Sequence, residues 1–279
     1  MGRSTFDITR REALAGLGGL VGGLLLPASA AARVRPAAPV VKRIRARAQM
    51  EGQGAVVQRV FPSADLAHLD PFVLLDDFDV VEPAGFPTHP HRGFEAFTYM
   101  LDGSFHHKDN LGNDSLIYSG GIQRFCSGRG AFHSEMPGPG RDNRGLQLWV
   151  NLPRRLKQMT PEYQGLDGKR LPLDEGHGQR VREIVGYRSA ADLKTEVQYL
   201  DVTLEPGRVF ARDIAAGWNT LVYVVSGSVE AAGQTLSRGD GVVLGEGALA
   251  VRASGASRFV FLSGVPHHEP ILLRGPFVD

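Results

Sequence analysis

The sequence has little cysteine and no excess of charge of either sign. Cys126 is the only cysteine among 279 residues, which excludes an intramolecular disulfide, so cysteine pairing says nothing about the compartment. Only Arg124 and Arg129 lie close enough in sequence to favour a thiolate, which favours a buried structural thiol over a redox-sensitive one. The formal net charge is +1, so there is no electrostatic reason to expect a nucleic-acid partner.

The sequence also lacks an apolar run long enough to cross a membrane as a helix. The uncharged run from Ala13 to Leu26 has 14 residues, and a transmembrane helix needs roughly 20, so we expect no stable membrane insertion. Arg10 and Arg11 precede this run, and the small residues 28–30 (ASA) follow as a cleavage site. Residues 1–30 are therefore predicted to be a twin-arginine (Tat) signal peptide. This predicts the Tat export machinery as a partner and a periplasmic or exported mature protein, with an uncleaved anchor as the alternative.

Glycine and proline are abundant, and the chain repeats itself. Gly 35, Pro 17 and a hydrophobic share of 42% are typical of a turn-rich β protein, and the length allows two domains. The segment Tyr99–Ser104 (YMLDGS) has a counterpart at Tyr223–Ser228 (YVVSGS), and Gly120-Gly121 has one at Gly239-Asp240. This repeat predicts two barrels of the same kind in one chain.

Two pairs of potential metal ligands open and close the stretch from residue 89 to 135. They are His89 with His91, and His133 with Glu135. Alternate residues of a strand point to the same face, so each pair directs both side chains into one space. The residues between the pairs have the character of short strands and turns, which is enough chain to bring the pairs together. Pro90 cannot donate to a ladder, which predicts that the first pair lies at a strand entry or a sheet edge.

Three imidazoles and one carboxylate suit a divalent transition ion. Fe, Mn, Co, Ni, Cu and Zn all accept such ligands, whereas Ca and Mg prefer oxygen. Four protein ligands on an ion that takes six leave two positions for water, dioxygen or a chelating substrate. We therefore expect any function of this stretch to depend on those two positions.

The segments that carry these residues resemble the pirin family, a branch of the cupin superfamily. The resemblance lies in HPHRGFE (His89–Glu95), GRGAFHSE (Gly128–Glu135), the longer segments Leu69–Glu95 and Leu146–Gln164, and the terminal GPFVD (Gly275–Asp279). It covers roughly residue 42 to the end. It implies a bicupin whose N-terminal barrel holds a metal, described as iron in the family, with His89, His91, His133 and Glu135 as ligands. Several family members show quercetin 2,3-dioxygenase activity.

We therefore expect an all-β chain of two tandem cupin (jelly-roll) barrels. The predicted domains are the signal peptide at 1–30, a metal-binding cupin domain with its crossover at 31–170, and a second cupin domain at 171–279. The resemblance implies a dioxygenase that takes dioxygen and a flavonol-like or catechol-like aromatic substrate at one ion, Fe(II) before Mn, Ni, Co, Cu or Zn. Glu135 would also accept the proton of the substrate hydroxyl. The alternative is a metal-dependent binding or redox-sensing protein without catalysis, because some family members bind transcription regulators or metabolic enzymes.

The second barrel is predicted to lack a metal. Aligning the two repeats places Asp213 and Ala215 at the positions of the first ligand pair, and Arg252 and Ser254 at those of the second. These four residues are no credible ligand set. The second barrel is therefore expected to be a packing partner that helps to shape the first site.

Three further groups allow more than one interpretation. His106 and His107 could contact a metal ligand or substrate, but a strand end followed by a turn is favoured. Glu95 is either a carboxylate behind the ligands or the partner of an arginine such as Arg92. Residues 267–269 (HHE) lie between two prolines near the end, which favours a surface or interdomain role over metal binding.

Overall fold

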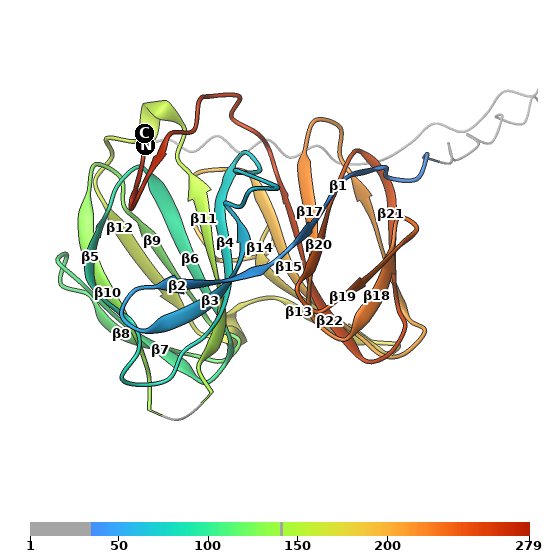
Figure 1. Cartoon of the computed structure of the whole chain (residues 1–279), viewed down its shortest axis with the longest axis horizontal. Helices are drawn as coiled ribbons and strands as arrows, with labels where there is room; N and C mark the ends of the chain where they lie inside the picture. The colour runs from blue at the N-terminus through green and yellow to red at the C-terminus, as the bar shows by residue number, and fades with distance from the viewer. Residues whose placement is uncertain (1–34, 140–141) are drawn as a thin grey trace, which may run out of the picture. The chain divides into compact units, whose positions relative to one another are not determined.

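The computed structural model describes residues 35–139 and 142–279, and nearly all of the regular structure in them is strand (Figure 1). The helical elements of this part are two single turns in the crossover, η1 (Arg154–Leu156) and η2 (Gly168–Arg170). No helix among these residues is long and apolar enough to cross a membrane. The all-β prediction is confirmed, whereas the predicted signal at 1–30 lies outside the described residues.

The first barrel packs a seven-stranded sheet against a four-stranded one. The sheet orders are β12-β9-β6-β11-β4-β3-β2 and β5-β10-β7-β8, and all neighbours are antiparallel. The strands are β2 (Arg47–Glu51), β3 (Ala55–Phe61), β4 (Phe72–Asp79), β5 (Phe86–His91), β6 (Phe94–Asp102), β7 (Ser104–Asp109), β8 (Asp114–Tyr118), β9 (Ile122–Cys126), β10 (Ala131–Pro137), β11 (Arg144–Asn151) and β12 (Glu162–Leu166). Phe78 and Met100 of the larger sheet pack with Phe105 and Ile117 of the smaller one.

The second barrel repeats this arrangement. Its sheet orders are β1-β20-β17-β22-β15-β14-β13 and β16-β21-β18-β19. The strands are β1 (Val40–Arg45), β13 (Leu173–Gly176), β14 (Gln179–Val185), β15 (Val197–Leu204), β16 (Val209–Ile214), β17 (Asn219–Ser226), β18 (Ser228–Ala231), β19 (Gln234–Ser237), β20 (Asp240–Leu244), β21 (Gly247–Ala253) and β22 (Ser257–Gly264). A short hairpin of β23 (Leu273–Arg274) and β24 (Phe277–Val278) ends the chain.

β1 departs from the predicted domain range of 31–170, because it pairs with β20 of the second barrel. Two kinds of contact explain the pairing. The side chain of Ile44 is buried in the core, and the flanking Arg43 and Arg45 bind Asp240 at 3.1 and 2.8 Å. The next strand, β2, belongs to the first barrel. β1 therefore belongs to the second barrel, although it precedes all strands of the first barrel in the sequence.

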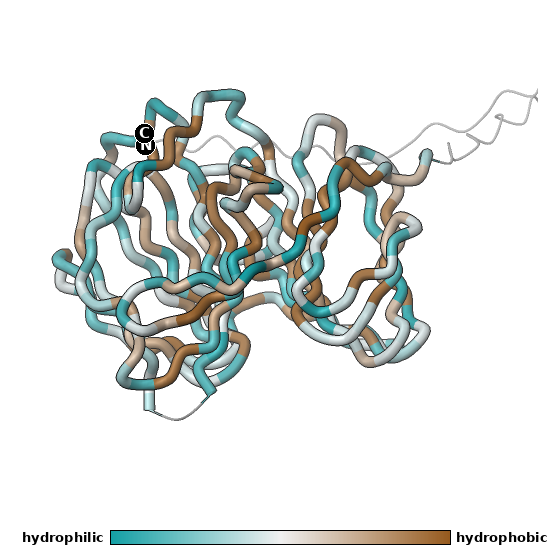
Figure 2. The backbone as a smooth tube through the Cα atoms, in the orientation of Figure 1, coloured by the Kyte–Doolittle hydropathy of each residue, from teal (hydrophilic) through white to brown (hydrophobic). Residues whose placement is uncertain are grey.

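The strands of the four-stranded sheets include one with strict alternation, whereas β4, β6 and β20 of the seven-stranded sheets are buried along nearly their whole length. In β21 buried and exposed residues alternate throughout, and Figure 2 shows similar short changes from brown to teal along strands of both barrels. The largest buried cluster draws on both seven-stranded sheets, with Leu148 and Tyr99 from the first and Tyr199 and Leu221 from the second. The two barrels therefore share a core.

The contact between the barrels has matching halves. Tyr99 of β6 donates its hydroxyl to Asp201 of β15 at 2.7 Å, and Tyr223 of β17 donates to Asp77 of β4 at 3.2 Å. Each aspartate is also held by two hydrogen bonds from an arginine of its own barrel. These pairs are Arg258 with Asp201 and Arg144 with Asp77. The repeat seen between Tyr99 and Tyr223 in the sequence is thus also a structural repeat.

Candidate metal centre

The four-stranded sheet of the first barrel brings both predicted ligand pairs together. β5 carries His89 and His91 at the edge of this sheet, and its neighbour β10 carries His133 and Glu135. In the register, His133 lies directly opposite His89. The edge position agrees with the presence of Pro90 in β5, because an edge strand tolerates a residue without an N–H donor.

The three histidines converge on one point. The Nε2 atom of His89 lies 3.0 Å from Nε2 of His91 and 3.1 Å from Nε2 of His133. Their ligand atoms all lie within 4.8 Å of one another, and within residues 35–139 and 142–279 no other group of three or more His, Cys, Asp or Glu forms such a cluster. This arrangement could hold a metal ion.

The hydrogen bonds of the other ring nitrogens show that the three imidazoles suit a cation. Nδ1 of His89 lies 2.8 Å from the carbonyl oxygen of Pro87, and Nδ1 of His91 lies 3.3 Å from that of Pro276, so each Nδ1 donates and each Nε2 keeps its lone pair. Burial and the neighbouring His89 lower the pKa of His91 to about 3, and burial also holds the pKa of His133 well below its usual range. Neutral imidazoles whose lone pairs face one another repel unless a cation lies between them.

His107 continues the site behind His133. Its Nδ1 lies 3.4 Å from Nδ1 of His133, and its Nε2 lies 3.0 Å from the carboxylate of Asp109. With Asp109 accepting from Nε2, Nδ1 of His107 is left to accept from His133, which keeps Nε2 of His133 free for a metal. β7 ends at Asp109 and a turn follows, as the favoured interpretation expected, but His107 in addition contacts a predicted metal ligand. His106 is partly exposed and bonds Asp114 at the surface.

Glu135 lies beside the three histidines without joining their cluster. Its Oε2 is 3.9 Å from Nε2 of His133. Nε2 of Gln147 donates to Oε2 at 3.0 Å, the amide of Gln123 donates to Oε1, and the hydroxyl of Thr98 lies 2.5 Å from Oε1. These contacts fix the carboxylate at the wall of the barrel. Its roles as fourth ligand and as proton acceptor remain predictions.

Glu95 and Cys126 form part of a buried layer next to the site. Glu95 accepts from Nε of Arg124 at 2.7 Å and from the backbone N–H of Lys194 at 3.0 Å. The suggested partner Arg92 was wrong, because it bonds the C-terminal residue, whereas Arg124 lies on the neighbouring strand β9. Cys126 is buried, as predicted, and burial, followed by the charge of Glu95, raises the pKa of its thiol to about 12, which disfavours the reactive thiolate.

The late HHE segment bridges the barrels, as the interdomain interpretation expected. The backbone N–H groups of His267 and His268 donate to Asp70 ahead of β4. The ring of His267 lies 3.0 Å from Thr195, which precedes β15. The carboxylate of Glu269 accepts from the backbone N–H of Arg154 at 2.6 Å.

The C-terminal hairpin returns to the first barrel and supports His91. It supplies Pro276, whose carbonyl accepts from that ring, and it is anchored by Lys157, which donates to the carbonyls of Gly93 and Val278, both at 2.9 Å. Burial lowers the pKa of Lys157 to about 8. Sequence reasoning did not predict this role, although the terminal GPFVD segment was part of the family resemblance.

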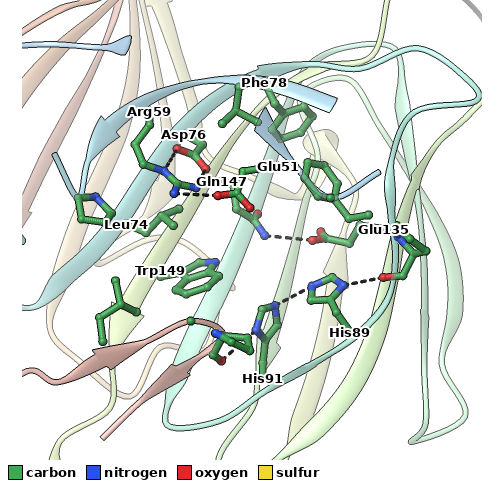
Figure 3. A pocket seen from close by; sticks show the side chains of 18 of the residues that line it. Glu51, Arg59, Leu74, Asp76, Phe78, His89, His91, Glu135, Gln147 and Trp149 are labelled. Carbon is green, nitrogen blue, oxygen red and sulfur yellow. Dashed lines mark hydrogen bonds and ion pairs between the residues drawn. The ribbon is translucent and has the colours of Figure 1, made fainter. Parts of the chain in front are cut away.

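A cavity of about 650 Å³ lies against the histidines. His89, His91, Glu135 and Trp149 contribute to its wall (Figure 3). Phe86 also lines it. His89 is partly exposed. The candidate metal position therefore adjoins a space large enough for a small aromatic molecule.

Known proteins resemble the chain over most of its length. The pirin family model matches residues 54–150, and the model of the pirin C-terminal cupin domain matches residues 199–279. A pirin-like protein of Solanum lycopersicum is 44% identical over 250 residues, which are 86% of each chain, and pirin of Homo sapiens is 38% identical over 251 residues, which are 86% of this chain and 87% of that one.

A solved structure titled quercetin 2,3-dioxygenase, from Acinetobacter baumannii, is similar in fold. Its TM-score is 0.81 at 29% identity, with 87% of this chain and 92% of that chain covered. The histidine cluster found among the described residues lies in the barrel that the pirin model matches. Because the two family models and the relatives together cover most of its length, the chain belongs to the pirin family.

Proposed function

We propose that this protein is a metal-dependent dioxygenase that acts on flavonol-like or catechol-like aromatic compounds. The observation that carries the proposal is the cluster of three histidine ligand atoms, two of whose side chains, His89 and His91, line the 650 Å³ cavity. The fold shared with a protein titled quercetin 2,3-dioxygenase supports the reaction class. The proposed ion is Fe(II), and Mn, Ni, Co, Cu and Zn suit the same ligands.

The side chains of the site divide the work of binding and proton transfer. His89, His91 and His133 would hold the ion, which when bound offers open positions to substrate oxygens and dioxygen and lowers the pKa of a coordinated hydroxyl. Oε2 of Glu135 would take the proton of that hydroxyl, and Gln147 orients it by its hydrogen bond. The apolar cavity wall would exclude water from the reacting ring.

The rival function is a metal-dependent binding or redox-sensing protein without catalysis. A sensing ion needs no room for a substrate, whereas here two of the three histidines line a cavity of about 650 Å³. The cavity therefore favours an enzyme.

Oxygen uptake tests the proposal. Protein loaded with iron or manganese is expected to consume oxygen in the presence of quercetin, and Glu135→Gln, which keeps the size but loses the base, is expected to lower the rate by about 10²–10⁴-fold. Replacing both His89 and His91 with alanine should abolish metal binding and uptake. His106→Ala on the outer face of the same sheet is the matched control. No uptake with any first-row metal across a panel of flavonols and catechols contradicts the proposal.

A further inference from the structure

We infer that the cavity has a second recognition site, remote from the metal ligands, which selects aromatic substrates carrying a hydroxyl donor at the end that faces away from the ion. This inference rests on the proposed function and adds the specificity of the same cavity. The site consists of Glu51, Arg59 and Asp76, which we call the distal acidic site. Figure 3 shows these side chains on one side of the cavity and His89 and His91 on the other.

The distal acidic site is built by neighbouring strands. Arg59 of β3 lies directly opposite Asp76 of β4 in the register. Its Nε and Nη2 atoms donate to the two oxygens of Asp76 at 2.8 and 2.6 Å, and its Nη1 lies 2.9 Å from Oε1 of Glu51 on β2. Two carboxylates around one guanidinium leave a net charge of −1 in the wall of the cavity. That charge disfavours a substrate with a carboxylate at this end.

The free hydrogen-bonding capacity of this site lies at Oε2 of Glu51, because Oε1 already accepts from Arg59 at 2.9 Å and from Nε2 of Gln49 at 3.0 Å. Both oxygens of Asp76 already accept from Arg59, and the Asp76 side chain is only 7% exposed. The Glu51 side chain is 35% exposed, and an ionised carboxylate offers about four acceptor positions and no donor. A ligand that reaches Glu51 must therefore bring a donor, such as a phenolic hydroxyl.

Trp149 supplies an aromatic wall of the cavity. The ring lines the cavity, stacks on Phe94 with centroids 4.0 Å apart and packs against His91 with centroids 5.0 Å apart. In Figure 3 it lies between His91 and the distal acidic site. It offers a flat apolar surface to a planar ligand.

Together these groups describe a flat, polyhydroxylated aromatic ligand. Its chelating oxygens would face the histidines, its ring would pack against Trp149, and a hydroxyl at the opposite end would donate to Glu51. A flat ligand that has only the chelating oxygens lacks the last contact. A hydrogen bond to a charged acceptor corresponds to about a tenfold or greater difference in affinity.

Binding without turnover tests this inference. In a Trp218→Phe background Trp149 is the only tryptophan, so its fluorescence reports on the cavity. Zinc-loaded protein, freed of excess metal, is titrated with quercetin and with 3-hydroxyflavone, which share the chelating oxygens and differ in the remaining hydroxyls. Quercetin is expected to bind at least about tenfold more tightly, and Glu51→Ala is expected to remove most of this difference. Met50→Ala is the matched control, because Met50 precedes Glu51 on the same edge strand and its side chain is exposed.

The outcomes separate the two proposals. Equal affinity for both compounds, or a preference that Glu51→Ala leaves intact, overturns the distal acidic site while quercetin binding itself still supports the proposed function. If neither compound quenches Trp149, the cavity is not a flavonol site, which overturns the distal acidic site and the flavonol form of the proposed function.

Discussion

Replacing Asp109 with asparagine should weaken metal binding without changing a ligand. The carboxylate accepts from His107 and from three donors of the following turn, and its side chain is fully buried. Burial acts to raise the pKa of Asp109, but the hydrogen bonds from His107 and Asn113 hold it below its usual value, so His107 faces an anion. An amide can donate to Nε2 of His107, which moves the His107 proton to Nδ1 and forces the proton of His133 onto Nε2, where a metal needs the lone pair.

The expected loss is about 10–100-fold in metal affinity, or about 1.4–2.7 kcal/mol. Equilibrium competition with a chromogenic chelator at neutral pH measures it, and thermal unfolding of the metal-free protein shows whether the variant is folded. Asp114→Asn is the matched control, because it removes an exposed partner of His106 from the same sheet and should leave both metal affinity and stability nearly unchanged. If both variants bind zinc as tightly as the natural chain, the hydrogen-bonded chain from Asp109 to His133 does not position the ligand.

Three further outcomes follow from the structure. In the metal-free protein the folded-state pKa values of His91, about 3, and of His133 lie below the unfolded value of 6.5. The unfolded chain therefore binds more protons than the folded chain as the pH falls below 6.5, and each histidine should lower the free energy of unfolding by about 1.4 kcal/mol at pH 5.5. Urea unfolding at pH 7.5 and 5.5 measures the difference. Gly93→Ala should loosen the C-terminal hairpin and lower stability by about 1–3 kcal/mol. Gly93 has a φ of 87°, and an added Cβ would lie 1.9 Å from the carbonyl oxygen of Val278. Faster proteolysis of the C-terminus is the expected readout. Replacing Arg10 and Arg11 with lysine should stop the predicted Tat export in the native host. If cell fractionation finds both the natural chain and this variant unprocessed in the cytoplasm, the prediction is wrong.

Strand alternation predicted the centre of the site but not its surroundings. His89, His91 and His133 could be found because a residue and its second neighbour share a face, and this local rule needs no knowledge of the fold. The same rule places Phe105, His107 and Asp109 on one face of β7, opposite the more exposed His106 and Lys108. Because two histidines are adjacent there, the sequence alone did not show which of them faces the site.

The contacts that depend on distant pairing could not be predicted from local patterns. Arg124 reaches Glu95 because β6 and β9 are neighbours, and Pro276 reaches His91 from the far end of the chain. The pairing of β1 with β20 likewise depends on Asp240, which is about 200 residues away. Nothing in the residues near Glu95 or His91 specifies these partners.

The two repeats share their interface residues but differ at the candidate metal-ligand positions. Tyr99 and Tyr223 occupy equivalent places and each binds an aspartate of the opposite barrel, so the contact between the barrels retains its twofold pattern. At the ligand positions the second barrel has Asp213, whose exposed side chain lies 3.7 Å from Arg35 at the surface. Buried charged pairs are costly to break once one partner is lost, which ties the interface residues of both repeats to one another. Asp213 takes no part in the contact between the barrels, so that contact does not depend on what occupies the ligand-equivalent position.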